Sequence, residues 1–197
     1  MNAGSLVLAA ATILGAASPV AVFDQVTPPA VPGDLNVSSD ERAFLIAHAE
    51  GTQNYVCLPT AAGGYNWVLF GPQATLFDED GGQVITHFLS ANPVEGGTPR
   101  PTWQHSRDTS RVWAALAAQS SDPAYVAPNS IPWFLLRPVG AQYGPEGGAR
   151  LTRTSAIQRV NTSGGVAPST GCAASTDAGR KALVPYSADY VFYRMRD

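Results

Sequence analysis

Short apolar runs, separated by clusters of glycine, proline and aspartate, recur along almost the whole sequence. Two examples are YNWVLF at 65–70 and IPWFLLRPVG at 131–140, both rich in aromatic and β-branched residues. Such residues favour the pleated conformation, and the intervening turn residues favour many short elements over long helices. The pattern therefore predicts an all-β domain, an antiparallel β-sandwich or barrel of about eight short strands with long loops.

Other segments fit the same pattern. Residues 74–89 are typical of a hairpin whose turn is Asp-Glu-Asp-Gly-Gly at 78–82. In the last run, alternate residues share one face, and we expect this aromatic stripe to lie in the core: Tyr186, Ala188, Tyr190 and Phe192. Residues 38–51 are ambiguous, because Ser38 and Glu41 fit a helix capping box. The alternation that begins at Phe44 favours a strand there.

The composition limits the classes of function. The 197 residues are enough for one ordinary domain, and 45% of them are hydrophobic. Charged residues are only 14%, against roughly 25% in typical soluble proteins, and the net charge is −3. Lysine and arginine are scattered, so no basic run is present to bind phosphates, and no nucleic-acid partner is expected.

The first residues have the pattern of an export signal. Leu6 to Ala17 form an apolar stretch too short to span a bilayer, with small residues before Ser18. We predict a signal peptide at 1–17, a Pro-rich extended arm at 18–40 and a single β domain at 41–197. The protein is then secreted, with no membrane span in the mature chain.

Two cysteines, Cys57 and Cys172, follow this segment. In an oxidising compartment an isolated pair is more often bridged than free, so we predict a disulfide, the alternative being two buried thiols. The bridge would pin the polar, Gly-rich loop 161–171, whose Asn161 and Thr162 are candidate ligand-binding residues. Asn36 and Asn161 also begin Asn-x-Ser sequons.

The three histidines are the candidate metal ligands. His48 and His87 fall on predicted apolar strand faces, where an imidazole usually donates a hydrogen bond to a buried carbonyl. The alternative hypothesis is a copper or zinc site that uses both histidines. No HxH or HExxH spacing supports that site, and no cofactor is predicted. His105 falls in a predicted loop, where we expect it to be solvated.

Aromatic residues are the candidates for stacking on a carbohydrate, namely Trp67, Trp103 and Trp113. Trp103, flanked by Pro101 and polar residues, is expected to be the exposed one, with His105 beside it. The sequence lacks a GxSxG elbow, a GxGxxG turn after a strand and a GxxxxGK loop. Catalysis is therefore not indicated.

Several motifs occur in an order that resembles a known family: GTQNYVC (51–57), LFDEDG (76–81), THF (86–88), IPWFLL (131–136), IQRVNTSGGVAPSTGC (157–172) and VPYSADYVFY (184–193). The chain is similar to a family of secreted bacterial and fungal proteins catalogued as a domain of unknown function. The resemblance implies an exported, disulfide-bonded, mostly β domain and carries over no catalytic residue. Fungal members often bear the label "malate dehydrogenase", but the absence of a βαβ unit and a glycine fingerprint argues against that activity here.

One segment departs from the family pattern. PTWQHSRDTS (101–110) stands where relatives have a plain Asp-Gly-Ser turn, so His105 is not expected to be a ligand throughout the family. The sequence as a whole predicts an exported, non-catalytic binding or structural module whose partner is a cell-wall polymer or another protein. The alternative is a metal-binding protein or metal-dependent enzyme that uses His48 and His87.

Overall fold

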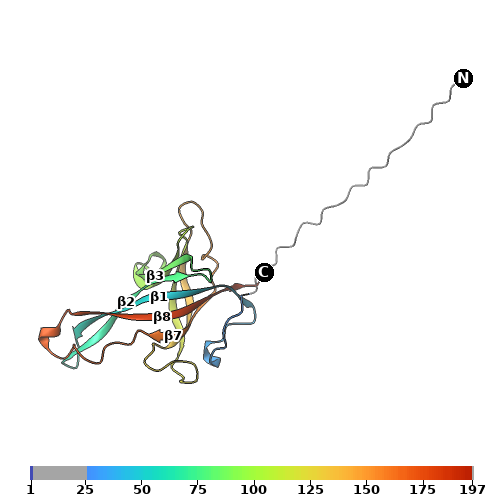
Figure 1. Ribbon diagram of the computed structural model, residues 1–197. Helices are drawn as coiled ribbons and strands as arrows, with labels where there is room; N and C mark the ends of the chain where they lie inside the picture. The colour runs from blue at the N-terminus through green and yellow to red at the C-terminus, as the bar shows by residue number, and fades with distance from the viewer. Residues whose placement is uncertain (2–25, 197) are drawn as a thin grey trace.

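The computed structural model describes Met1 and residues 26–196, which form eight strands closed into an antiparallel barrel (Figure 1). Each strand pairs with the next along the chain, and the last pairs with the first. The strands are β1 (Glu41–Pro59), β2 (Tyr65–Phe77), β3 (Gln83–Asn92), β4 (Thr98–His105), β5 (Arg111–Ser120), β6 (Trp133–Gln142), β7 (Ala156–Gly164) and β8 (Lys181–Met195). The all-β prediction is confirmed, and of its two forms the barrel is the one observed.

Within the described residues, helical structure is limited to the short 3-10 turns η1 (Gly33–Leu35), η2 (Pro93–Glu95) and η3 (Ser175–Asp177). None of the helical segments there has the length and apolarity needed to cross a membrane. The predicted signal peptide and the first part of the arm, residues 18–25, lie outside the described residues apart from Met1.

The strands are longer than expected, because two glycines lie within them and do not end them. β1 has 19 residues and contains Gly51, and β2 has 13 and contains Gly71. A Cβ on Gly51 would lie 2.2 Å from the backbone oxygen of Gln73. Glycine is thus required there because β1 and β2 approach closely at this position. It lies within a strand and does not form a turn. The helix alternative for 38–51 is wrong, since β1 begins at Glu41.

The barrel interior is the main core. Alternate residues of each strand point inward, as a period of two requires, and pack as one cluster. The aromatic stripe predicted for the last run lies in this cluster, through Tyr186, Ala188, Tyr190 and Phe192 of β8. The barrel is therefore filled by side chains over most of its length.

A second cluster covers the outer face of β7 and β8. Leu35, with Val31 and Val37, packs on residues that include Val160 and Val191. The backbone oxygen of Leu35 accepts a hydrogen bond of 2.7 Å from Gln158 Nε2. Residues 26–37 thus form an arm laid against the barrel, blue in Figure 1 beside the C-terminal end of β8. Because the arm covers this side, residues 156–160 of β7 are buried on both faces.

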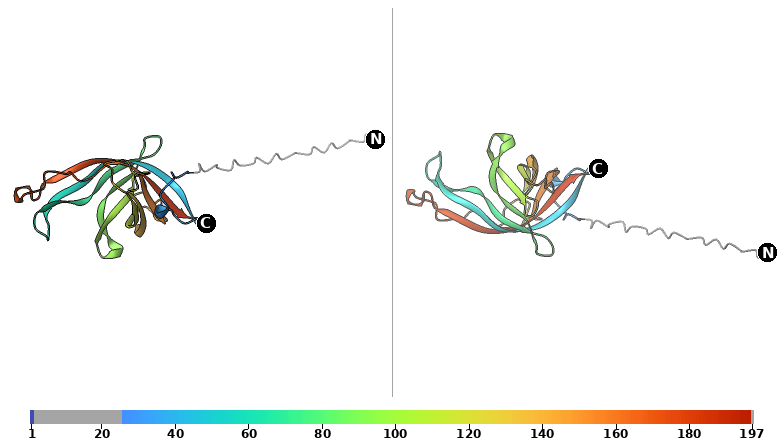
Figure 2. Two further views of the ribbon diagram at one scale, coloured as in Figure 1. Left: turned by 90° about the horizontal axis from the view of Figure 1, so that it is seen from below. Right: turned by 90° about the horizontal axis from the view of Figure 1, so that it is seen from above.

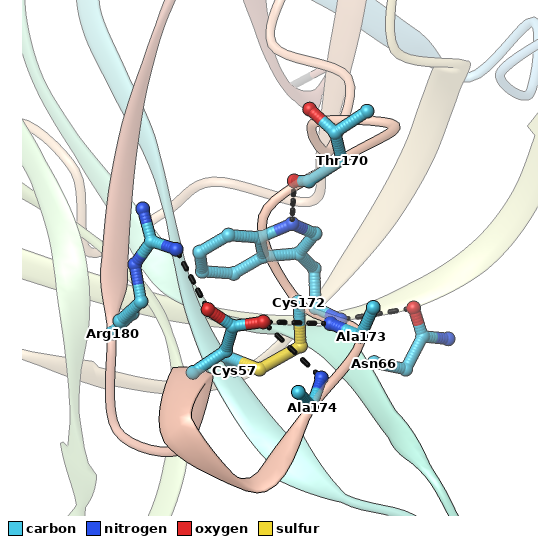
Figure 3. Close-up of a disulfide and its surroundings, with 9 residues drawn as sticks. Cys57, Asn66, Thr170, Cys172, Ala173, Ala174 and Arg180 are labelled. Carbon is cyan, nitrogen blue, oxygen red and sulfur yellow. Dashed lines mark hydrogen bonds and ion pairs between the residues drawn. A yellow bond between two sulfur atoms is a disulfide. The ribbon is translucent and has the colours of Figure 1, made fainter.

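The predicted disulfide is confirmed. Cys57 of β1 is bonded to Cys172, with their Cα atoms 5.5 Å apart (Figure 3). The same segment is held by Trp67 Nε1, which donates to the oxygen of Thr170 at 2.9 Å, and by the Asp177 carboxylate, which accepts from the amides of Ala173 and Ala174. It lies at the end where β1, β2 and β8 extend beyond the other strands (Figure 2).

Candidate functional site

A small cavity of about 80 Å³, partly open to solvent, is lined by several unusual polar residues of the barrel interior. Its polar lining residues are Gln53, His87, Trp103, Arg159 and Tyr190, and its apolar ones are Leu69, Pro72, Pro101, Phe134 and Leu136. Leu69 is 52% exposed, so the cavity lies close to the outer surface on that side. Seven of the eight described strands contribute lining residues, so the cavity forms only when the barrel is closed.

Arg159 carries the charge of this cavity. It follows Ile157 by two residues on β7, so its side chain points into the barrel, and only 8% of it is exposed. Its Nη2 donates to the oxygen of Pro132 at 2.8 Å, and its Cζ lies 3.8 Å from the centre of the Phe134 ring. Among the described residues no carboxylate lies within ion-pair distance of Arg159, and its buried Nε has no hydrogen-bond partner. A guanidinium stays protonated in proteins, so the cation is buried without a counter-ion.

His87 stands on β3, opposite Trp103 of β4 in the sheet register. The two rings are stacked, with centroids 4.3 Å apart and planes 11° apart. His87 Nδ1 lies 2.9 Å from the oxygen of Thr102. A carbonyl can only accept, so the proton is on Nδ1 and Nε2 is left as an acceptor.

The charge state of His87 follows from its surroundings. Burial lowers the pKa of His87 to about 3, and the positive charge of Arg159 acts in the same direction, against the hydrogen bond to Thr102. The imidazole is therefore neutral at physiological pH. Burial also raises the pKa of Tyr190, which keeps that hydroxyl protonated.

Two more residues of the cavity lining carry a buried donor without a partner. Trp103 is 1% exposed, and its Nε1 finds no acceptor among the described residues. The same is true of Nε2 of Gln53, which stands on β1 beside the bulge between Asn54 and Tyr55. Buried donors are normally paired, because each unpaired one costs about 1–3 kcal/mol. Three residues that line one cavity therefore each carry a buried, unpaired N–H group, and one of the three is the cation itself. Such a cluster suits a ligand with acceptor oxygens.

The residues predicted to bind a ligand do not lie together. Trp103 lines the cavity, and its predicted exposure is wrong. His105 is buried too, so its predicted solvation is also wrong: its Nδ1 accepts from the amide of Asp108 at 3.2 Å. Thr162 is buried and donates to the oxygen of Ile131. Asn161 is exposed and donates to Asp189 on the outside of the barrel.

The two predicted metal ligands lie on opposite sides of the barrel wall. His87 is inside, whereas His48 lies between the inward-facing Ala47 and Ala49 and therefore points outward. His48 Nδ1 is 2.7 Å from Asp189 and its Nε2 is 3.1 Å from Glu79. The two imidazoles thus do not form one site. Within residues 26–196, no group of three histidine, cysteine, aspartate or glutamate residues is arranged to hold a metal ion.

A larger groove, about 960 Å³ in volume, separates the arm from the adjoining ends of β1 and β8. Several of its charged groups are occupied within the fold. Glu41 accepts from Arg137 at 2.6 Å, Arg194 lies over the ring of Phe44, and Arg196 donates to the oxygen of Ser39. Nε of Arg194 lacks a hydrogen-bond partner among the described residues, but this side chain is only half-buried. We therefore place the candidate site in the barrel interior, where the buried Arg159 lies with the unpaired donors of Gln53 and Trp103.

Sequence reasoning missed Arg159 and Gln53. For Arg159 a signal was present: in the run AIQRV an arginine shares the strand face of Ile157, which is an unusual place for a charge unless it is paired or functional. For Gln53 no signal was present, because a glutamine in a strand is ordinarily exposed.

Comparisons with curated proteins and with solved structures gave no significant match. A family model described as "Protein of unknown function (DUF3455)" matches residues 38–194, which include β1 to β7, β8 as far as Arg194, the cavity and the disulfide. The chain belongs to this family.

Proposed function

We propose that the protein is an exported, non-catalytic binding module that holds a small anion in the barrel cavity. The observation that carries the proposal is Arg159, a buried guanidinium with no carboxylate partner among the described residues. Leaving a charge buried and uncompensated costs about 3–5 kcal/mol. A ligand that brings the missing negative charge would recover much of that cost on binding, which gives the site a strong preference for anions.

The size of the cavity favours a small molecule over a polymer. Its volume of about 80 Å³ corresponds to roughly two to three water molecules at liquid density. Stacking of a cell-wall polysaccharide on Trp103 would need an exposed indole, and this one is buried. An eight-stranded barrel is just wide enough to hold one small ligand.

Export is part of the proposal. The disulfide between Cys57 and Cys172 supports it, because such bonds persist in oxidising compartments. The apolar stretch from Leu6 to Ala17, typical of a signal peptide, supports it independently.

The test compares the protein with Arg159→Met, which keeps the length of the side chain and removes its charge. Arg107→Met is the matched control, because Arg107 is exposed and is not among the residues that line the cavity. Melting temperatures are measured with and without millimolar formate, acetate, phosphate and chloride. We expect at least one anion to stabilise the protein and the control but not Arg159→Met. Equal responses in all three proteins, or none in any, would contradict the proposal.

The same variant gives a prediction that needs no ligand. Removing an uncompensated buried charge relieves its desolvation cost, so Arg159→Met should raise the free energy of unfolding of the ligand-free protein by about 1–3 kcal/mol in urea titrations. The control should change it by no more than about 0.5 kcal/mol. A large loss of stability would mean that the contacts of Arg159 with Pro132 and Phe134 justify its burial without any ligand.

A further inference from the structure

The cavity also limits the chemistry of its anion, an inference that rests on the proposed function. Arg159 is the sole cationic side chain among the described residues that line it. One buried cation balances one negative charge, whereas a divalent oxyanion would bring an unbalanced charge into a region of low polarity. The ligand is therefore a monoanion.

The unpaired donors fit a carboxylate. A guanidinium is a planar fork that matches the two oxygens of a carboxylate. Within the described part of the chain Nε of Arg159 has no hydrogen-bond partner, and neither have the N–H groups of Gln53 and Trp103. All three are covered by neighbouring atoms, so binding requires these side chains to turn toward the ligand. Three donors for two acceptor oxygens is the pattern of a bound carboxylate.

The remaining polar wall requires a donor from the ligand. His87 is neutral and carries its proton on Nδ1, where it is bonded to Thr102. Nε2 therefore has a lone pair, and it forms no hydrogen bond with the described residues. A ligand that carries only a carboxylate would leave this acceptor unpaired, whereas a hydroxyl group would donate to it.

The rest of the lining is apolar. Leu69, Pro72, Pro101, Phe134 and Leu136 surround the cavity and offer no side-chain hydrogen bond. They accept a short hydrocarbon body and exclude a second charged group.

We infer that the ligand is a small hydroxylated monocarboxylate, whose carboxylate pairs with Arg159 and whose hydroxyl donates to His87 Nε2. Formation of the complex breaks and forms no covalent bond. The carboxylate enters already ionised, and the histidine stays neutral.

Matched pairs of probes test this assignment by isothermal titration: acetate against glycolate, and propionate against lactate, with phosphate and sulfate as the divalent and larger anions. A hydrogen bond to a buried acceptor that is otherwise unpaired should give about tenfold tighter binding of the hydroxylated member in each pair. His87→Phe, which keeps a flat ring against Trp103, should bind acetate but lose this preference. Arg107→Met should keep it.

The outcomes separate this inference from the proposed function. Equal affinity within each pair, or tighter binding of phosphate or sulfate, overturns the hydroxycarboxylate and leaves an anion site. Failure of every anion to bind overturns both. If His87→Phe does not fold, the ¹⁵N shift of His87 in the unmodified protein replaces it. Nε2 should shift with glycolate and not with acetate, and an unchanged Nε2 overturns the inference.

Discussion

At the scale of single residues, the two histidines of the barrel wall have opposite electrostatic surroundings. His87 lies inside the barrel against Trp103, where burial keeps it neutral. His48 lies outside it between two carboxylates, those of Asp189 and Glu79. The same residue type therefore makes stability depend on pH with opposite signs at the two positions.

For His87 the folded pKa of about 3 lies below the ordinary value of 6.5. Between these two pH values the unfolded chain binds more protons than the folded one. The stabilisation that the neutral, buried His87 gives the folded state is therefore complete above pH 6.5. It is lost as the pH falls toward 3, at up to about 1.4 kcal/mol per pH unit. We expect His87→Phe to flatten the acid side of the stability curve, as measured by urea unfolding at a series of pH values. An unchanged acid slope would show that His87 protonates without cost.

For His48 the hydrogen bond to Asp189 raises the pKa, and contact with Glu79 adds to the effect against partial burial. Here the folded state binds more protons, so the stabilisation is present below pH 6.5 and is lost as the pH rises through the raised folded value. We expect His48→Gln to remove stability at pH 5.5 and much less at pH 9. The neighbouring Asn161 also donates to Asp189, so Asn161→Ala serves as the comparison that removes a neutral partner. Equal losses at both pH values would contradict the prediction.

The exposure of individual side chains was the least predictable property at this scale. Trp103 and His105 are flanked by proline and polar residues, which are typical of a loop. Both nevertheless point inward, because β4 pairs with β3 in a register that places Trp103 opposite His87 and His105 opposite Ile85. Which face of a strand is buried is decided by its partners, and that information is not local.

At the scale of the elements, the disulfide closes a long covalent loop, with a sequence separation of 115 residues. It joins β1 to the segment before β8, at the end of the molecule where these strands project (Figure 2). The bridge therefore restrains the unfolded chain over more than half of its length.

We expect the double variant Cys57→Ala, Cys172→Ala to lower the free energy of unfolding by up to about 4–5 kcal/mol, the chain-entropy limit for a loop of this size. Chemical denaturation measures the loss, with reduced unmodified protein as the control. The bonds of Trp67 and Asp177 hold the same segment, so the native barrel should remain folded. A loss below about 1 kcal/mol would mean that these contacts already restrain the unfolded chain.

Local chemistry decides how well an element can be predicted. The hairpin turn at 78–82 was predicted correctly because its own residues form it: Asp78 accepts from the amide of Gly82 at 2.6 Å. The length of β1 was not predicted correctly, because the role of Gly51 depends on Gln73 of the neighbouring strand. A glycine looks the same in a sequence whether it ends a strand or allows two strands to approach.

At the scale of the whole molecule, the arm makes the outer face of β7 a second core. Leu35 is fully buried there, among residues that include Val160 and Val191. Leu35→Ala should lower the free energy of unfolding by about 2–5 kcal/mol, the usual cost of a cavity left by leucine. Leu183→Ala is the control, since Leu183 is 63% exposed on β8. Thermal and urea unfolding give both values, and similar losses would mean that the arm contributes little.

The sequence left the choice between sandwich and barrel open because the deciding contact joins the first strand to the last. Glu41 pairs with Met195 and Val56 with Lys181, across nearly the whole chain. Alternation of apolar and polar residues is the same in both architectures. The interior charge was hidden for the same reason, because Arg159 is enclosed only when barrel closure places it beside Gln53 and Trp103.

β7 carries two environments on one short strand, and side-chain direction alternates between them. Ile157 and Arg159 face the barrel, while Gln158 and Val160 face the arm. A slip of one residue would exchange these sides. When family members are aligned, a single-residue gap between Ala156 and Val160 would therefore place a different residue at the inward position of Arg159, although strand number and composition stay almost the same. A gap of equal size beyond Gly164, past the end of the strand, would carry no such meaning.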